Sequence, residues 1–311
     1  MRHCCVIGGT GFIGSYVVHQ LSMTDRRVTV IGRSALPRGY IPKNVRYCAG
    51  DYGDKAFLTN VISDADEIIN LAYSSVPKTS FDDPVFDIQS NLPSAVALFQ
   101  VAAQLNINKI VLVSSGGTVY GNAKTASIDE THLTNPVSPY GITKLAIEKY
   151  GLMFNAINDL PLVIARPGNA YGSGQIPFSG QGFIATAIGS VLQGKPITLF
   201  GKTGTIRDYI HVTDVARGIV ALLTDGDVGQ CYNIGSNVGR SNLDIIDALR
   251  PLAGQIGMDL QVQVLPERKF DVSTNVLNSR KLTSDTGWTE KMSFCEGLSE
   301  TWNAFLKTLH A

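Results

Sequence analysis

The sequence has no excess of either charge. Lysine and arginine total 26 residues and so do aspartate and glutamate, which gives a formal net charge of zero. A chain without net charge has no long-range field to attract nucleic acid or an anionic membrane surface. We therefore expect neither as a partner, and local groups must bind any anionic ligand.

Long apolar runs, paired cysteines and clustered histidines are also missing. No stretch reaches the roughly 20 apolar residues of a membrane span, and we expect no cleavable leader before the first apolar run at 3–7. The five cysteines include no C-x-x-C pair, and the five histidines lie far apart. We expect reduced thiols, no metal site and a cytoplasmic protein.

A glycine-rich turn follows the first apolar run. Gly8, Gly11 and Gly14 form the pattern G-x-x-G-x-x-G and lead into a helix predicted over 12–22. Glycines at such a turn let the backbone approach a pyrophosphate, which then lies at the positive end of the helix. The placement directly after a strand predicts a dinucleotide-binding site.

The end of the second predicted strand, 27–31, leaves the choice of dinucleotide open. An NAD-binding fold usually has a carboxylate here for the adenosine ribose, but this chain has Gly32 followed by Arg33. Arg33 suits the 2′-phosphate of NADP, or it stacks on the adenine. Asp51, after the strand predicted at 45–49, is positioned either to accept from adenine or to cap the next helix.

Strands and helices alternate from residue 3 to 166, with further strands predicted at 67–72, 109–113 and 161–165 and a long helix at 85–104. This alternation predicts a Rossmann-like, doubly wound parallel sheet. Beyond it the pattern changes, and residues 231–234 look like a strand that returns to the main sheet. We predict an α/β fold with a dinucleotide-binding domain of 1–167 plus about 206–235, and a smaller C-terminal α/β lobe of about 168–205 and 236–311 for the substrate.

Tyr140 and Lys144 form the pattern Y-x-x-x-K at the start of a predicted helix, with Pro139 suited to its first turn. Residues four apart lie on one helix face. A phenol with its ordinary pKa of about 10 is a poor base at neutral pH, and an adjacent ammonium lowers that value. The pair is therefore a candidate for proton transfer, although such spacing is also common on helix surfaces.

Further motifs occur in one order along the chain: Gly8-x-x-Gly11-x-x-Gly14, Gly50-Asp51, Leu71-Ala72, Asn91, Ser114-Ser115, Val119-Tyr120-Gly121, Tyr140-x-x-x-Lys144, Arg166-Pro167-x-Asn169, Arg207-Asp208-Tyr209 and Gly287-Trp288. Together they resemble the extended short-chain dehydrogenases/reductases, specifically the UDP-glucose 4-epimerase group of the NAD-dependent epimerase/dehydratase family. The resemblance covers nearly the whole chain. It implies a bound NAD, a UDP-sugar substrate and a homodimer formed through the long helices.

The resemblance also implies residue roles. Tyr140 would take the proton of the sugar 4-hydroxyl, while Lys144 would hydrogen-bond the nicotinamide ribose and lower the Tyr140 pKa. The implied cofactor-binding residues are Gly8, Gly11, Phe12, Ile13, Gly14, Arg33, Asp51, Tyr52, Leu71, Ala72, Tyr73, Asn91, Ser114, Tyr140, Lys144 and Pro167. The implied substrate-binding residues are Ser75, Thr118, Asn169, Arg207, Arg268, Asp271 and Asn275.

Three positions depart from the family pattern. Gly116 stands where the family usually has a catalytic Ser or Thr, so Ser115, Thr118 or water must supply that hydroxyl, and we favour Thr118. Gly32-Arg33 replaces the usual Asp, which keeps NADP open. Asn275 aligns with a position that is often Tyr in hexose-only enzymes, and the smaller side chain predicts room for a 2-N-acetyl group.

The predicted reaction is 4-epimerisation of UDP-GlcNAc/UDP-GalNAc, of UDP-glucose/UDP-galactose, or of both, which suggests polysaccharide synthesis. A 4,6-dehydratase would need a carboxylate where this chain has Gly117-Thr118. An NADPH-dependent 4-keto-sugar reductase is the alternative, because Arg33 suits NADPH. A non-catalytic dinucleotide sensor would have no need of Tyr140 and Lys144.

Overall fold

The computed structural model describes residues 1–123, 125, 127–268 and 272–309. Its main sheet contains seven strands in the order β10-β6-β5-β4-β1-β2-β3, and all neighbouring strands are parallel. The strands are β1 (His3–Ile7), β2 (Arg27–Gly32), β3 (Val45–Ala49), β4 (Glu67–Asn70), β5 (Lys109–Val113), β6 (Leu162–Pro167) and β10 (Cys231–Ile234). The strand order reverses between β1 and β4, and ligands of such sheets bind at that point beyond the carboxyl ends.

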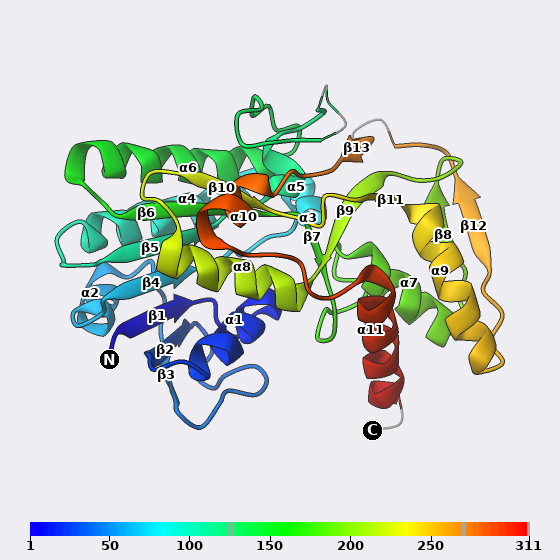
Figure 1. The fold of residues 1–311 in the computed structure, drawn as a ribbon, viewed down its shortest axis with the longest axis horizontal. Helices are drawn as coiled ribbons and strands as arrows, with labels where there is room; N and C mark the ends of the chain where they lie inside the picture. The colour runs from blue at the N-terminus through cyan, green and yellow to red at the C-terminus, as the bar shows by residue number, and fades with distance from the viewer. Residues whose placement is uncertain (124, 126, 269–271, 310–311) are drawn as a thin grey trace.

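Helices cover both faces of this sheet (Figure 1). The helices α1 (Phe12–Ser22), α8 (Val212–Asp225) and α10 (Arg280–Thr286) lie on one face, and α2 (Lys55–Ile62), α4 (Pro84–Ala102) and α6 (Pro139–Asn158) lie on the other. Alternate strand residues point to opposite faces, so Cys4 and Val6 join the α1/α8 core while Cys5 and Ile7 join the α2/α4/α6 core. The predicted Rossmann-like, doubly wound α/β fold is confirmed.

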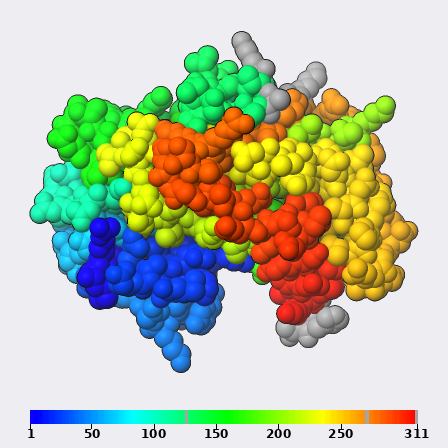
Figure 2. Space-filling view, in the orientation of Figure 1, coloured from blue at the N-terminus to red at the C-terminus, as the bar shows by residue number. Residues whose placement is uncertain are grey.

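A second, smaller lobe lies at the right of Figure 1. Strands β7 (Asn169–Tyr171), β9 (Ile206–His211), β11 (Gly239–Ser241) and β13 (Thr274–Asn275) form one small sheet, and β8 (Ile197–Phe200) pairs with β12 (Val262–Leu265). The helices α7 (Phe183–Leu192), α9 (Asn242–Gln255) and α11 (Phe294–Leu309) share one apolar core with these strands. Figure 2 shows the surface hollowed between the N-terminal residues, in blue, and the C-terminal helix, in red.

Several local features differ from expectation. Between the strands and helices predicted above, the structure contains two more short helices, α3 (Pro77–Asp82) and α5 (Gly116–Val119). Asp54, not Asp51, caps α2, because its Oδ1 accepts the Ala56 and Phe57 backbone N–H groups. Short caps and single-turn helices depend on side-chain geometry that hydrophobic periodicity does not report.

Asp214 links α8 to the segment before α11. The N-cap of α8 is His211, and Asp214 lies in the first turn, where its carboxylate accepts the backbone N–H groups of Lys291 and Met292. This residue therefore fastens the segment before α11 to the main domain. Among the helices of the described residues, none combines the length and the apolar character that crossing a membrane requires.

Candidate active site

The glycine-rich turn has the geometry of a phosphate cradle. Gly8 has a φ of 79°, and a Cβ there would lie 2.8 Å from the Ala72 backbone nitrogen. A Cβ on Gly14 would lie 2.3 Å from the Gly8 carbonyl oxygen, whereas one on Gly11 would meet only that oxygen, at 3.3 Å. Helix α1 begins here with no side-chain cap and no acidic residue in its first turn. The N–H groups of its first turn and the open space beside Gly11 fit the pyrophosphate of a dinucleotide.

The residues that follow the carboxyl end of β4 border the site next to the glycine-rich turn. Leu71 continues the pairing with β1 through a 2.9 Å hydrogen bond from its N–H to the Ile7 carbonyl, and the Ala72 N–H donates to Asn70 Oδ1 at 3.1 Å. Asn91 is 1% exposed, and its Oδ1 accepts the Ser74 N–H at 2.7 Å. Asn91 therefore holds the backbone of the loop that borders the site.

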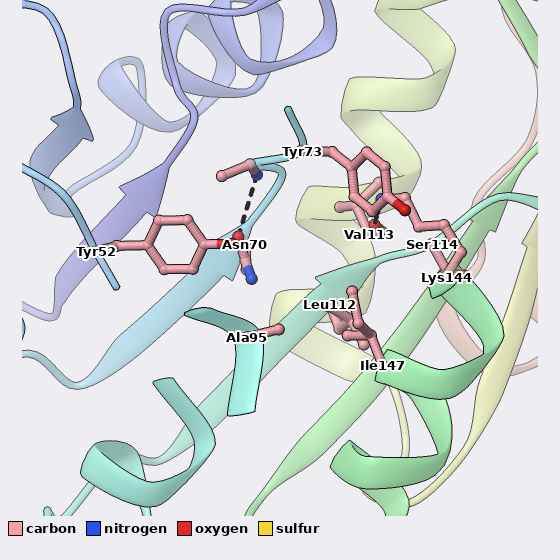
Figure 3. Close-up of a pocket in the computed structure, with 10 residues that line it drawn as sticks. Tyr52, Asn70, Tyr73, Ala95, Leu112, Val113, Ser114, Lys144 and Ile147 are labelled. Atoms are coloured by element: carbon pink, nitrogen blue, oxygen red, sulfur yellow. Dashed lines mark hydrogen bonds between the residues drawn. The ribbon is translucent and has the colours of Figure 1, made fainter. Parts of the chain in front are cut away.

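The residues expected around adenosine lie at the neighbouring strand ends. Arg33 and Asp51 are exposed, at the ends of β2 and β3. The ring of Tyr52 lies against Asn70 in the pocket of Figure 3. Burial raises the Tyr52 pKa, and the Arg33 charge lowers it, so the guanidinium of Arg33 is within electrostatic reach of that ring.

Tyr140 and Lys144 lie in the first two turns of α6. Ser138 caps this helix by accepting the Gly141 N–H at 3.1 Å, and Pro139 occupies its first position. The Tyr140 N–H donates to Ser80 Oγ at 3.1 Å, which anchors the start of α6 to α3. The sequence therefore places the proton-transfer pair on a rigid, well-capped helix.

Lys144 is buried beside two tyrosine rings. Its Nζ donates to the Val113 carbonyl at 3.0 Å and lies 4.2 Å from the Tyr73 ring centroid (Figure 3). The Tyr140 ring centroid is 5.8 Å from Nζ and 4.8 Å from that of Tyr73, in an edge arrangement. The structure thus brings together Tyr73, Tyr140 and Lys144, with Ser114 lining the same pocket.

Burial dominates the titration of the pair. It raises the Tyr140 pKa, the Asp87 charge raises it further, and a hydrogen bond with Ser115 lowers it. Burial lowers the Lys144 pKa to about 8, against the opposing charges of Glu148 and Asp87. Lys144 therefore carries its positive charge at neutral pH, and burial outweighs the expected lowering of the Tyr140 pKa.

The segment after β5 explains the glycine at position 116. A Cβ on Gly116 would lie 2.6 Å from Leu277 Cδ1 and 2.8 Å from the Arg166 carbonyl oxygen. A hydrogen-bonding contribution from Ser115 lowers the Tyr140 pKa, and Thr118 Oγ1 is buried with no hydrogen-bond partner among the residues described. Both hydroxyls therefore remain candidates for the group beside the tyrosine.

Two buried carboxylates support this arrangement, and the sequence reasoning missed both. Asp87 is 0% exposed, accepts the Tyr73 hydroxyl at 3.2 Å and also accepts the Ser75 hydroxyl. Ser75 is thus held by Asp87. The only signal in the sequence was the four-residue spacing of Asp87 from Asn91.

Glu148 is the second buried carboxylate. Its oxygens accept Arg166 Nε at 3.0 Å and Nη2 at 2.5 Å, and Arg166 Nη1 donates to the Tyr120 hydroxyl at 2.9 Å. That hydroxyl donates to Asn233 Oδ1 at 2.8 Å. This network joins α6 to β6 and β10. Glu148 lies four residues after Lys144, and that spacing could have indicated that it belongs to the site.

The small sheet carries three of the expected substrate residues, Asn169, Arg207 and Asn275, beside the segment that follows β5. Asn169 in β7 pairs with Tyr209 of β9, and a Cβ on Gly117 would lie 3.3 Å from its Oδ1. Arg207 in β9 pairs with Asn275 in β13. Asn275 Nδ2 donates to the Gly116 carbonyl at 3.0 Å, while its Oδ1 is buried with no partner in the described part of the chain. These residues therefore border the segment that carries Ser115.

The remaining predicted residues are more scattered. Pro167 lies at the carboxyl end of β6, and the Arg268 guanidinium stacks 3.5 Å from the Phe200 ring centroid. Asp271 lies outside the described residues. Within residues 1–123, 125, 127–268 and 272–309, no three His, Cys, Asp or Glu side chains are grouped to hold a metal ion.

Comparisons with known proteins agree with this geometry. A model of the NAD dependent epimerase/dehydratase family matches residues 4–235. The UDP-glucose 4-epimerase of Lacticaseibacillus casei is 33% identical over 320 residues, covering 96% of this chain and 95% of that protein.

Solved structures are similar over the whole chain. The UDP-glucose 4-epimerase of Thermotoga maritima with UDP-glucose superposes with a TM-score of 0.93 and 29% identity, covering 99% of this chain and 100% of that one. The Thermus thermophilus UDP-glucose 4-epimerase with NAD gives a TM-score of 0.90 and 32% identity, covering 98% and 99%.

Proposed function

We propose that this chain, which belongs to the NAD dependent epimerase/dehydratase family, is a UDP-sugar 4-epimerase. The observation that carries the proposal is the position of Tyr140 and Lys144, buried on α6 beside the carboxyl ends of the main sheet. UDP-glucose 4-epimerases that match almost the entire chain support it. The family uses NAD, which fits the open turn at Gly8, Gly11 and Gly14.

The chain's own residues supply proton transfer and orientation. When bound, NAD supplies reversible oxidation at sugar C4. Tyr140 takes the proton from the 4-hydroxyl oxygen as C4 is oxidised and returns it when C4 is reduced from the opposite face. Ser115 shares the hydrogen bond that lowers the Tyr140 pKa, and Lys144 provides a positive charge that favours the phenolate. Tyr73, Ser80 and Asp87 hold these groups in place.

The substrate's nucleotide would lie across the small sheet. Arg207 in β9 is suited to the diphosphate, because a guanidinium forms paired charge-assisted hydrogen bonds with phosphate oxygens. Asn169, Arg268 and Asp271 are assigned to the nucleotide by family resemblance. The Asn169 side chain lies beside Gly117. This links the region to the segment 114–118 after β5, which contains Ser115 and Thr118 and is called the catalytic segment below.

The sugar preference is proposed to include N-acetylhexosamines. Asn275 is smaller than a tyrosine, and its Oδ1 has no hydrogen-bond partner among described residues, so it offers an acceptor for an acetamido N–H. Substituting Asn275→Tyr should reduce kcat/KM for UDP-GlcNAc by at least tenfold and leave that for UDP-glucose within a few-fold. Equal kinetics of the variant and the parent on both sugars would contradict the assignment of Asn275.

We also propose a homodimer formed through an apolar surface on α4 and α6. This α4–α6 surface consists of Val85, Ile88, Leu92 and Val96 on α4, and Tyr150, Met153 and Ile157 on α6. Ile157 is 68% exposed and Val85 is 59% exposed, and Leu92, Val96 and Tyr150 line one groove. Apolar residues gathered on one surface of a folded chain favour association.

Arg33 supports a second candidate, an NADPH-dependent nucleotide 4-keto-sugar reductase. Its exposed guanidinium at the end of β2 suits a 2′-phosphate. One experiment distinguishes the two functions. Purified protein receives UDP-glucose or UDP-GlcNAc without added cofactor, and the anomeric protons are followed by NMR. Appearance of the C4 epimer supports the epimerase. No conversion, together with NADPH oxidation in the presence of a UDP-4-keto sugar, would support the reductase instead.

A further inference from the structure

Arg240 lies directly opposite Arg207 on the small sheet. The two residues are paired in the antiparallel strands β11 and β9, so their side chains project from the same face of the sheet. Like charges at such a position repel each other. The pair therefore places two guanidinium groups on neighbouring strands.

The guanidinium of Arg240 has no acceptor in the described part of the chain. Its Nη1 is buried without a hydrogen-bond partner, and the group rests 4.2 Å from the Phe294 ring centroid. The Arg240 charge lowers the pKa of Glu290, but the two residues form no ion pair. Buried donors in folded proteins almost always have partners, so this unpaired one points to a ligand.

The register of the strands shows where such a ligand would run. Arg207 pairs with Arg240 on one side and with Asn275 of β13 on the other, and Asn275 contacts the Gly116 carbonyl. The row therefore leads from the catalytic segment through Asn275 and Arg207 to Arg240. Adjacent strands are about 4.8 Å apart, which places Arg240 roughly 10 Å from Asn275 across the sheet.

We propose that Arg240 is a further substrate-binding arginine, besides Arg207 and Arg268, which hydrogen-bonds the phosphate next to the nucleoside. With the sugar at the catalytic segment and Arg207 at the diphosphate, that phosphate is the next group along the row. The inference rests on the proposed nucleotide-sugar substrate. Planar guanidinium groups form the strong, charge-assisted hydrogen bonds that phosphate oxygens accept.

Calorimetric titration of the purified, dinucleotide-loaded protein with UDP and with UMP tests this role. Arg240→Met should weaken both ligands by about 10- to 100-fold, the effect of losing a hydrogen bond between charged groups. Arg240→Lys keeps the charge but not the planar arrangement of donors. Its affinities for UDP and UMP should lie between those of the parent protein and those of Arg240→Met. Arg250→Met is the matched control, because Arg250 is an exposed arginine on α9 that pairs with Asp247.

The outcomes distinguish the inference from the function on which it rests. If the parent protein binds neither UDP nor UMP, the proposed nucleotide-sugar function fails. If the parent binds both and Arg240→Met binds them as Arg250→Met does, the role of Arg240 is overturned. Weakened binding of UDP with unchanged binding of UMP would overturn the assignment to the phosphate next to the nucleoside. Melting temperatures of the variants check that each one folds.

Discussion

Asp87 sets the electrostatic environment of the proton-transfer pair. It is fully buried, it accepts the hydroxyl groups of Tyr73 and Ser75, and it has no ion-pair partner in the described residues. Its negative charge raises the pKa of Tyr140 and that of Lys144. It thus opposes ionisation of the tyrosine while it helps to keep the lysine charged.

Replacing Asp87 with asparagine should shift the alkaline limb of the pH profile of kcat/KM to lower pH. The loss of the negative charge also lowers the Tyr140 pKa, but burial still raises that pKa above its ordinary value, so the limb set by Lys144 is the one to follow. Lys144 also loses its proton at lower pH, which moves the alkaline limb below the value near 8 that applies with Asp87 present. Exposed Asp259→Asn is the control, and a profile that stays fixed in Asp87→Asn would contradict this role.

At the scale of elements, α6 depends on one buried ion pair. Glu148 and Arg166 are almost completely buried and form two hydrogen bonds between α6 and β6. Removing one partner leaves an uncompensated buried charge, whereas replacing both by apolar residues of similar size removes the charges together.

Glu148→Leu should therefore lower the free energy of unfolding by about 3–5 kcal/mol, with a loss of activity because α6 carries Tyr140 and Lys144. The double variant Glu148→Leu/Arg166→Met should be more stable than Glu148→Leu alone. Urea denaturation followed by circular dichroism measures both. A double variant less stable than either single variant would argue that the pair itself stabilises the fold.

Different elements were predictable to different degrees. The main sheet followed from the alternation of apolar runs with helices, and the dinucleotide turn followed from Gly8, Gly11 and Gly14. The strands β11 and β13 are only three and two residues long, and their pairing with β9 joins distant segments, so local patterns could not reveal them. For the same reason no local pattern indicated that Arg240 faces Arg207.

Among the candidate site residues, the sequence could identify groups whose chemistry follows from spacing, such as Tyr140 and Lys144. It could not identify Asp87 as part of the site, because burial of a carboxylate is a tertiary property. The preference for Thr118 over Ser115 stays a prediction, because Ser115 contributes to the Tyr140 pKa while the Thr118 hydroxyl is buried with no partner among the described residues.

At the scale of the whole molecule, the proposed dimer would form through the α4–α6 surface. Ile157→Asp places a charge on the most exposed residue of that surface and should convert a dimer into a monomer at micromolar concentration. Leu133→Asp is the control, because Leu133 is 82% exposed but lies outside this surface. Light scattering coupled to size-exclusion chromatography measures the mass. A parent protein that elutes as a monomer, or an Ile157→Asp variant that stays dimeric, would exclude this interface.

We propose that Tyr140 moves a proton at the sugar 4-hydroxyl while C4 is transiently oxidised. Turnover of UDP-glucose in D2O without added cofactor, followed by NMR at C4, tests this proposal. The product should be a C4 epimer that keeps its original hydrogen at C4, and the rate should fall about 10²- to 10⁴-fold in Tyr140→Phe, which lacks the acid–base group. Deuterium at C4 of the product, or undiminished turnover by Tyr140→Phe, would contradict it.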